Sequence, residues 1–121
     1  MPEQEIFFNE SLNGKHVQVI KTYDSQLARE AFEQMDDNSK NVLKQALLTE
    51  GVFDFGKPEE TTDDDLWQGV EDGAREDWNS FSYFIVLEKS REANRYLFAC
   101  SDWPTAERVA KLNLSALSAG N

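Results

Sequence analysis

The dipeptide Asn13-Gly14 is the feature that most constrains how this chain folds. A two-residue type I′ turn needs positive φ at both central positions, and Asn followed by Gly tolerates that conformation best. The turn sets a register with Leu12 opposite Lys15, Phe8 opposite Val19, Glu10 opposite Val17 and Phe7 opposite Ile20, so that Phe8 and Phe7 both face apolar residues across the hairpin. Turn and register together predict a β-hairpin with strands at about residues 5 to 12 and 15 to 23.

Two helical patterns follow the hairpin. Asp24 or Ser25 can cap the first helix, and a fresh cap within residues 36 to 39 starts the second, which stops at Gly51. Apolar residues recur at spacings of three and four in both: Leu27, Ala28, Ala31, Phe32 and Met35 in the first, and Val42, Leu43, Ala46 and Leu47 in the second. We expect the two helices to form a helical hairpin, followed by a short extended piece at Phe53 and Phe55.

A third helix is predicted to begin after Thr62, because Thr62 and Asp65 have the spacing of a capping box, with Asp in place of the usual Glu. Its buried stripe consists of residues four apart: Leu66, Val70, Ala74 and Trp78. Trp67 lies beside that stripe, so of the two tryptophans it is the one we expect to be more exposed.

The last part of the chain predicts two further strands and a helix. Residues 81 to 87 are apolar on both alternating faces, as in a strand covered on both sides, and residues 95 to 100 can pair with them. A helix from about residue 102 carries Ala106, Val109 and Ala110 inward. The order ββαααββα predicts an α+β fold with an antiparallel sheet of about four strands, formed by residues 1 to 121 as a single domain whose tail, residues 115 to 121, frays.

The charge of the chain restricts its partners. Twenty-three acidic residues against twelve basic ones give a formal net charge of -11. Repulsion from phosphates excludes a general nucleic-acid binder and disfavours anionic membrane surfaces. No long apolar run and no basic segment before a hydrophobic one is present, so we expect neither a spanning helix nor a signal peptide. The single cysteine, Cys100, cannot close an internal disulfide, which agrees with a cytoplasmic location.

The negative charge is concentrated in one segment. Residues 54 to 77 hold ten acids and two bases, a net charge of -8 out of -11. From Asp63 to Asp77 a helix is about 21 Å long and carries about one net negative charge per 3.5 Å, which is comparable to the phosphate spacing of a nucleic-acid strand. The candidate partner-binding residues are therefore Asp54, Glu59, Glu60, Asp63, Asp64, Asp65, Trp67, Glu71, Asp72, Glu76 and Asp77.

No pattern of catalytic or ligand-binding residues stands out. Asp63, Asp64 and Asp65 point about 100° apart on a helix and cannot all bind one ion, so no metal site is expected. His16 and Cys100 are the only histidine and cysteine, and nothing in the sequence places them together as a nucleophilic pair. Serine-hydrolase, phosphate-loop and dinucleotide motifs are absent, so we expect no cofactor and no enzyme, although scattered carboxylates in a cleft would suit a small one.

Two interpretations of function stay open. In the first, the chain is a non-enzymatic binding protein, an inhibitor or immunity-type antagonist that presents a nucleic-acid-like acidic surface to a basic nuclease or another nucleic-acid-handling protein. In the second, it is a structural or adaptor subunit that associates, with another protein or as a homo-oligomer, through an apolar sheet surface containing Phe7 and Ile20. The acidic segment then contributes only to solubility and to a favourable interaction with the positive end of the helix dipole.

Overall fold

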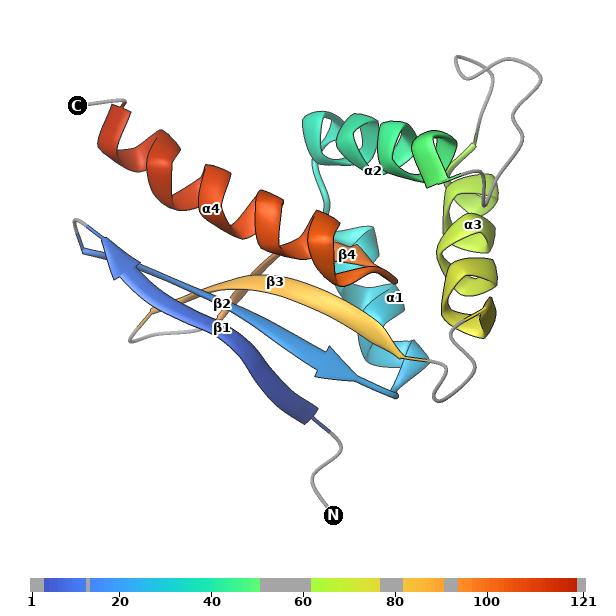
Figure 1. The fold of residues 1–121 in the computed structure, drawn as a ribbon, viewed down its shortest axis with the longest axis horizontal. Helices are drawn as coiled ribbons and strands as arrows, with labels where there is room; N and C mark the ends of the chain where they lie inside the picture. Colours follow the sequence, from blue (N-terminus) through green and yellow to red (C-terminus); the bar gives the residue numbers. More distant parts are fainter. Residues whose placement is uncertain (1–3, 13, 51–61, 77–81, 91–93, 120–121) are drawn as a thin grey trace.

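The computed structural model describes residues 4–12, 14–50, 62–76, 82–90 and 94–119 (Figure 1). The elements follow the predicted order ββαααββα, so the α+β fold is confirmed. Their bounds are β1 Gln4–Leu12, β2 Lys15–Thr22, α1 Ser25–Glu33, α2 Asp37–Glu50, α3 Asp63–Glu76, β3 Tyr83–Lys89, β4 Arg95–Cys100 and α4 Trp103–Ala119. Helix α4 thus extends its helical backbone beyond Leu114, into the segment for which the sequence predicts fraying.

The four strands form one antiparallel sheet in the order β1-β2-β3-β4. The predicted hairpin is confirmed, with Leu12 opposite Lys15 and Gly14 at a φ of 83°, while Asn13 lies outside the described residues. The pairs Phe8 with Val19 and Glu10 with Val17 are also as predicted. Strand β3 is buried from Tyr83 to Leu87, as its two apolar faces require.

The predicted pairing of Phe7 with Ile20 is wrong. Ile20 lies opposite Ile6, and the register shifts between Ile6 and Phe8, so that Phe7 is the extra residue of a β-bulge. The ring of Phe7 lies 5.5 Å from the ring of Phe84 and 5.5 Å from that of Trp103, at the start of α4. The bulge therefore turns Phe7 toward α4, and Ile6 takes its place beside Ile20.

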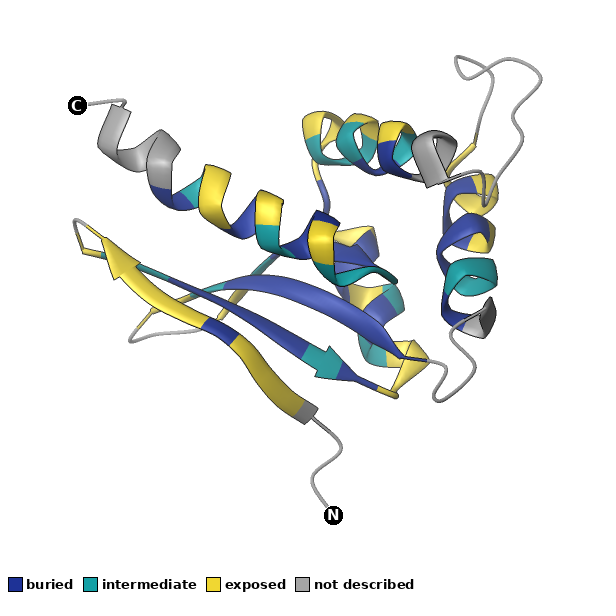
Figure 2. Ribbon diagram, in the orientation of Figure 1, coloured by how far each residue is buried: buried dark blue, intermediate teal, exposed yellow. Residues whose placement is uncertain are grey.

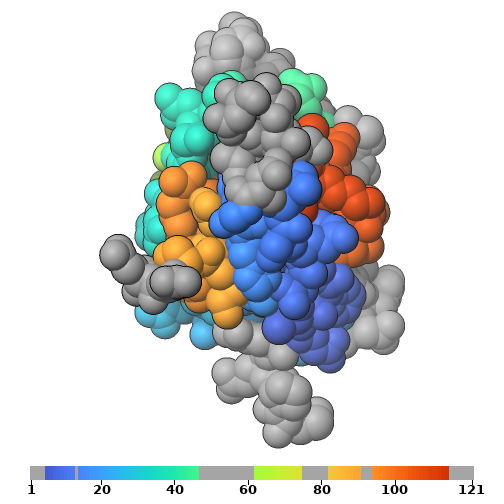
Figure 3. All heavy atoms as spheres, turned by 90° about the vertical axis from the view of Figure 1, so that its left-hand side faces the viewer, coloured from blue at the N-terminus to red at the C-terminus, as the bar shows by residue number. Residues whose placement is uncertain are grey.

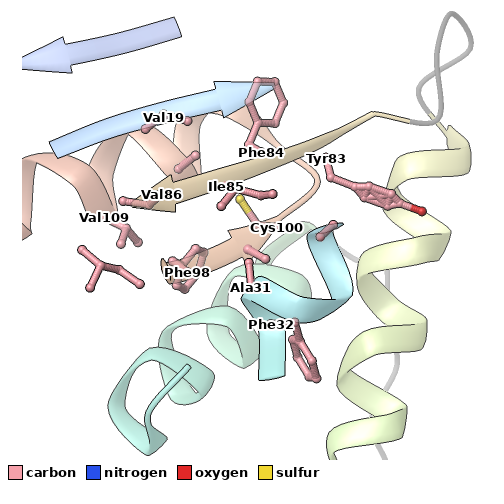
Figure 4. Packing of buried hydrophobic residues seen from close by; sticks show 14 of the residues in the cluster. Val19, Ala31, Phe32, Tyr83, Phe84, Ile85, Val86, Phe98, Cys100 and Val109 are labelled. Carbon is pink, nitrogen blue, oxygen red and sulfur yellow. The ribbon is translucent and has the colours of Figure 1, made fainter. Parts of the chain in front are cut away.

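Helices cover both faces of the sheet, and the burial pattern follows this arrangement (Figure 2). Register aligns Val19, Val86 and Phe98 on one face, where Phe98 meets Val109 of α4. Ile85 and Ala99 point to the opposite face, where α1 packs against β3 and β4 through Ala28 and Ala31 (Figure 4). The inward positions predicted for α4 are confirmed, since Ala106, Val109 and Ala110 are buried.

The predicted hairpin of the first two helices is wrong. Helix α2 packs against α3 and β4 and does not fold back along α1 (Figure 1). The predicted cap of α2 is confirmed, because the backbone N–H of Ser39 donates to the carboxylate of Asp36 at 2.8 Å. This cap determines where α2 begins but not the direction in which it runs. The direction of α2 depends instead on the distant strand and helix that it meets. As a result, α2 begins at the edge of β4, where its first turn also approaches α4.

Candidate functional site

Helix α3 is attached to the body of the protein by one apolar side. Leu66, Val70 and Ala74 are buried, as the stripe predicted. Its start is fixed by the predicted capping box: the Thr62 N–H donates to a carboxylate oxygen of Asp65 at 3.2 Å, and the Asp65 N–H donates to the Thr62 hydroxyl at 3.2 Å. The sequence therefore placed both the start and the inner side of this helix correctly.

Trp67 is buried, so it does not fit the partner-binding role for which it is a candidate, and its exposure cannot be compared with that of Trp78, which lies outside the described residues. The Trp67 side chain is only 9% exposed and stacks on Tyr83, with ring centroids 5.7 Å apart and planes 9° from parallel. Phe32 of α1 lies 5.5 Å from its ring, and the Arg29 guanidinium lies 5.6 Å from it. Trp67 is thus a core residue that joins α3 to α1 and β3, and it offers little surface to a partner.

The outer side of α3 carries the described acids of the segment. Asp64 and Asp65 are exposed, and Glu71 and Asp72, about two turns further along, are half-buried. At about 100° per residue these four positions lie on the side opposite Leu66 and Val70. The Gln68 side-chain amide lies among them and donates to Asp72 at 3.0 Å. The acids therefore share one face, which we call the acidic face of α3: Asp64, Asp65, Glu71 and Asp72.

Cations from other helices partly compensate the first turn of α3. Lys40 of α2 lies 2.9 Å from Asp63, and Arg29 of α1 lies 3.5 Å from Asp64. Lys40 also lies 5.9 Å from the ring of Phe32, so its ammonium is held between that ring and Asp63. No local sequence pattern indicates these pairs, because Arg29 and Lys40 are 35 and 23 positions away from their partners.

The remaining candidate residues are not placed by the structure. Asp54, Glu59, Glu60 and Asp77 lie outside the described residues, as do Phe53 and Phe55 of the predicted extended piece and Trp78 of the predicted buried stripe. Glu76 is the last residue of α3, and its side chain is not described. The described acidic face therefore represents part of the segment identified from the sequence.

A second surface lies on the hairpin and combines apolar with polar side chains. Strand β1 is an edge strand whose residues 5–12 are exposed except at Phe8, whereas β2 beside it is mostly buried, and Figure 3 shows β1 at the surface on one side of the molecule. Ile6 is 60% exposed and borders a hollow of about 360 Å³. That hollow is lined by Ile6, Gln18, Ile20, Leu27, Leu87, Lys89, Asn94 and Tyr96.

The two residues suited to nucleophilic chemistry are kept apart. Cys100 ends β4 and is buried, with its thiol donating to the backbone oxygen of Asp102 at 3.3 Å. His16 lies on β2, opposite Lys89 at the other end of β3, and hydrogen-bonds Asn9. In the part of the chain that the structure describes, no three His, Cys, Asp or Glu side chains gather as a metal site requires.

Comparisons of the chain with protein-family models, curated proteins and solved structures give no match. Among the described helices, none has both the length and the apolar character needed to cross a membrane.

Proposed function

We propose that this chain is a non-enzymatic binding protein that presents the acidic face of α3 to a basic protein, as an inhibitor or immunity-type antagonist of a nucleic-acid-handling protein. The observation that carries the proposal is the placement of Asp64, Asp65, Glu71 and Asp72 on one side of a helix whose other side is buried. Carboxylates gathered on one side of a helix attract a surface built to bind phosphates.

The ion pairs of the first turn do not remove this attraction. The side chain of Asp64 is 90% exposed and that of Asp63 is 62% exposed, so both carboxylates remain in contact with water. Pairs between exposed groups contribute about 0 to 1 kcal/mol, which a cluster of partner cations can replace. Arg29 and Lys40 therefore reduce the negative charge of the first turn of α3 but leave its carboxylates accessible to a partner.

The burial of Trp67 changes how the proposed interaction is stabilised. Aromatic anchors provide much of the energy of a typical interface, and Trp67 is committed to the core. The described part of α3 therefore contributes mainly charge, which acts on the association rate and on the choice of partner. We expect binding that weakens steeply as salt is added.

The test is a set of affinity measurements against a panel of basic nucleases, with lysozyme and cytochrome c as basic proteins that do not act on nucleic acids. Two four-site variants are compared with the unmodified chain. The first neutralises the acidic face: Asp64→Asn, Asp65→Asn, Glu71→Gln and Asp72→Asn. The second neutralises four acids elsewhere: Glu5→Gln, Glu10→Gln, Glu30→Gln and Glu107→Gln. Both make the net charge of -11 less negative by four units, so they differ only in location.

We expect at least one nuclease to bind the unmodified chain and the second variant, and to lose tenfold or more in affinity for the first. Equal losses of affinity in the two variants would show that binding depends on the net charge and not on the position of the acids, which would contradict the proposal. Affinity that survives in the first variant, or a panel without any binder, would contradict the proposal. A cytoplasmic location stays a prediction from the sequence.

The second candidate function is that of a structural or adaptor subunit, and the exposed edge strand β1 favours it. Ile6 is 60% exposed next to the buried Ile20, so an apolar strip reaches the surface at the sheet edge. Sedimentation at low and high salt separates the two candidates. Association through the strip persists at high salt and is lost in Ile6→Lys, whereas an electrostatic complex weakens with salt.

A further inference from the structure

A second hollow lies where β4 meets the start of α2 and the middle of α4. It has two parts that share Ser39 and Asn113. One part, of about 220 Å³, is mainly apolar and is also lined by Asn38, Val42, Phe98, Val109 and Leu112. The other, of about 440 Å³, is mainly polar and is also lined by Gln34, Asp36, Arg95, Tyr96 and Leu97. A ligand that fills both parts needs an apolar end and a polar end.

The polar part holds one charge of each sign. Asp36 accepts the backbone N–H of Ser39 with one oxygen at 2.8 Å. The hydrogen bonds from the Ser39 backbone and side chain, together with the positive charge of Arg95, lower the pKa of Asp36, so it is ionised at neutral pH. Arg95 is exposed, and no residue in the described part of the chain, Asp36 included, forms an ion pair with it within 4.0 Å.

These charges restrict the chemistry of the ligand. An anion alone is attracted by Arg95 and repelled by Asp36, whereas a cation alone is attracted by Asp36 and repelled by Arg95. A group with an ammonium and a carboxylate satisfies both residues at once, and guanidinium binds carboxylate well because its donors match the two oxygens. Gln34 and Asn113 add neutral polar groups at the same place.

The apolar part fits a side chain. A cavity of roughly 150 Å³ lined by apolar residues accepts benzene, so a hollow of about 220 Å³ has room for a branched aliphatic or an aromatic side chain. Phe98 is fully buried at its base, and Leu112, 56% exposed, lies at its open side.

We propose that this hollow binds a free α-amino acid with an apolar side chain, with the carboxylate on Arg95, the ammonium on Asp36 and the side chain against Val42 and Leu112, above the buried Phe98. This site uses none of the residues of the acidic face of α3. A negative result for this site therefore leaves the function proposed above unaffected, and the converse also holds.

The first test is an NMR titration of the whole ¹⁵N-labelled chain with L-leucine and L-phenylalanine. Three further titrations use glycine, which lacks the side chain, N-acetyl-leucine, which lacks the ammonium, and leucine amide, which lacks the carboxylate. We expect saturable shifts at residues of the hollow for leucine or phenylalanine, with affinity at least tenfold above that for each of the three probes. No saturable shift with either amino acid, or N-acetyl-leucine or leucine amide binding equally well, would overturn the proposal.

The second test uses variants that keep the fold. Asp36→Asn keeps an oxygen to accept the Ser39 N–H and removes the charge, and Arg95→Gln removes the other charge. Asp102→Asn is a matched control, because Asp102 accepts the N–H of Thr105 in the same way at the start of α4. Arg108→Gln, on the exposed side of α4, is the control for Arg95.

We expect a tenfold or greater loss of leucine affinity in Asp36→Asn and in Arg95→Gln, and less than a twofold change in the two controls. Leu112→Glu places a charge at the open side of the apolar part and should also abolish binding. Thermal unfolding of each variant verifies that it is folded. Affinity retained in Arg95→Gln, or lost equally in the controls, would overturn the site.

Discussion

Replacing Trp67 by alanine tests how α3 is attached. The side chain is 9% exposed, stacks on Tyr83 at 5.7 Å and contacts Phe32 at 5.5 Å. Truncating a buried tryptophan costs about 3 to 5 kcal/mol, and each aromatic pair contributes about 0.5 to 1.5 kcal/mol of such a loss. We expect Trp67→Ala to lower the free energy of unfolding by about 4 kcal/mol, a large share of the roughly 5 to 15 kcal/mol typical of a domain.

The assay is urea unfolding followed by far-ultraviolet circular dichroism, which does not depend on tryptophan fluorescence. Trp67→Phe keeps an aromatic ring in the stack and is the matched variant, with an expected loss less than half that of Trp67→Ala. A loss below about 1 kcal/mol in Trp67→Ala would refute the packing of α3 described above. Trp67 would then be a surface residue and again a candidate contact for a partner.

Other substitutions test the bulge, the cap and the compensating cations. Phe7→Ala should cost about 1 to 2 kcal/mol through lost contacts with α4 and β3, whereas Ile6→Ala should cost under about 0.5 kcal/mol, both measured by urea unfolding. Asp36→Ala should cost about 1 kcal/mol at neutral pH. Because the pKa of Asp36 is lowered on folding, its charge stabilises the protein above the ordinary value of 3.8. Its advantage over Asp36→Asn should vanish as pH falls through the lower folded value, and a constant difference down to strong acid would contradict this. Lys40→Gln should raise affinity for a basic nuclease about threefold by freeing Asp63, with a stability change below about 1 kcal/mol; unchanged or lower affinity would contradict it.

Features of the fold that depend on neighbouring residues could be predicted from the sequence. The Asn13-Gly14 turn set the register of the hairpin near its tip, and the Thr62 and Asp65 pair set the start of α3. The apolar run of β3 correctly indicated a strand buried on both faces. In each case the determining groups lie within a few residues of one another.

Features that depend on distant packing could not be predicted. The bulge at Phe7 exists because its ring packs with Phe84 and Trp103, which come from β3 and α4. The burial of Trp67 depends on Phe32 and Tyr83 meeting it from other elements. The same reason applies to the candidate site, because the cations beside its first turn come from helices α1 and α2.

The most direct measurement of the proposed role of α3 is a competition between this chain and a fluorescently labelled DNA duplex for the nuclease that binds the chain most tightly. We predict that the unmodified chain and the variant neutralised at Glu5, Glu10, Glu30 and Glu107 displace the duplex. The variant neutralised at Asp64, Asp65, Glu71 and Asp72 should need at least tenfold more protein to do so. Binding of the chain without displacement of the duplex, or equal displacement by both variants, would contradict the role of α3.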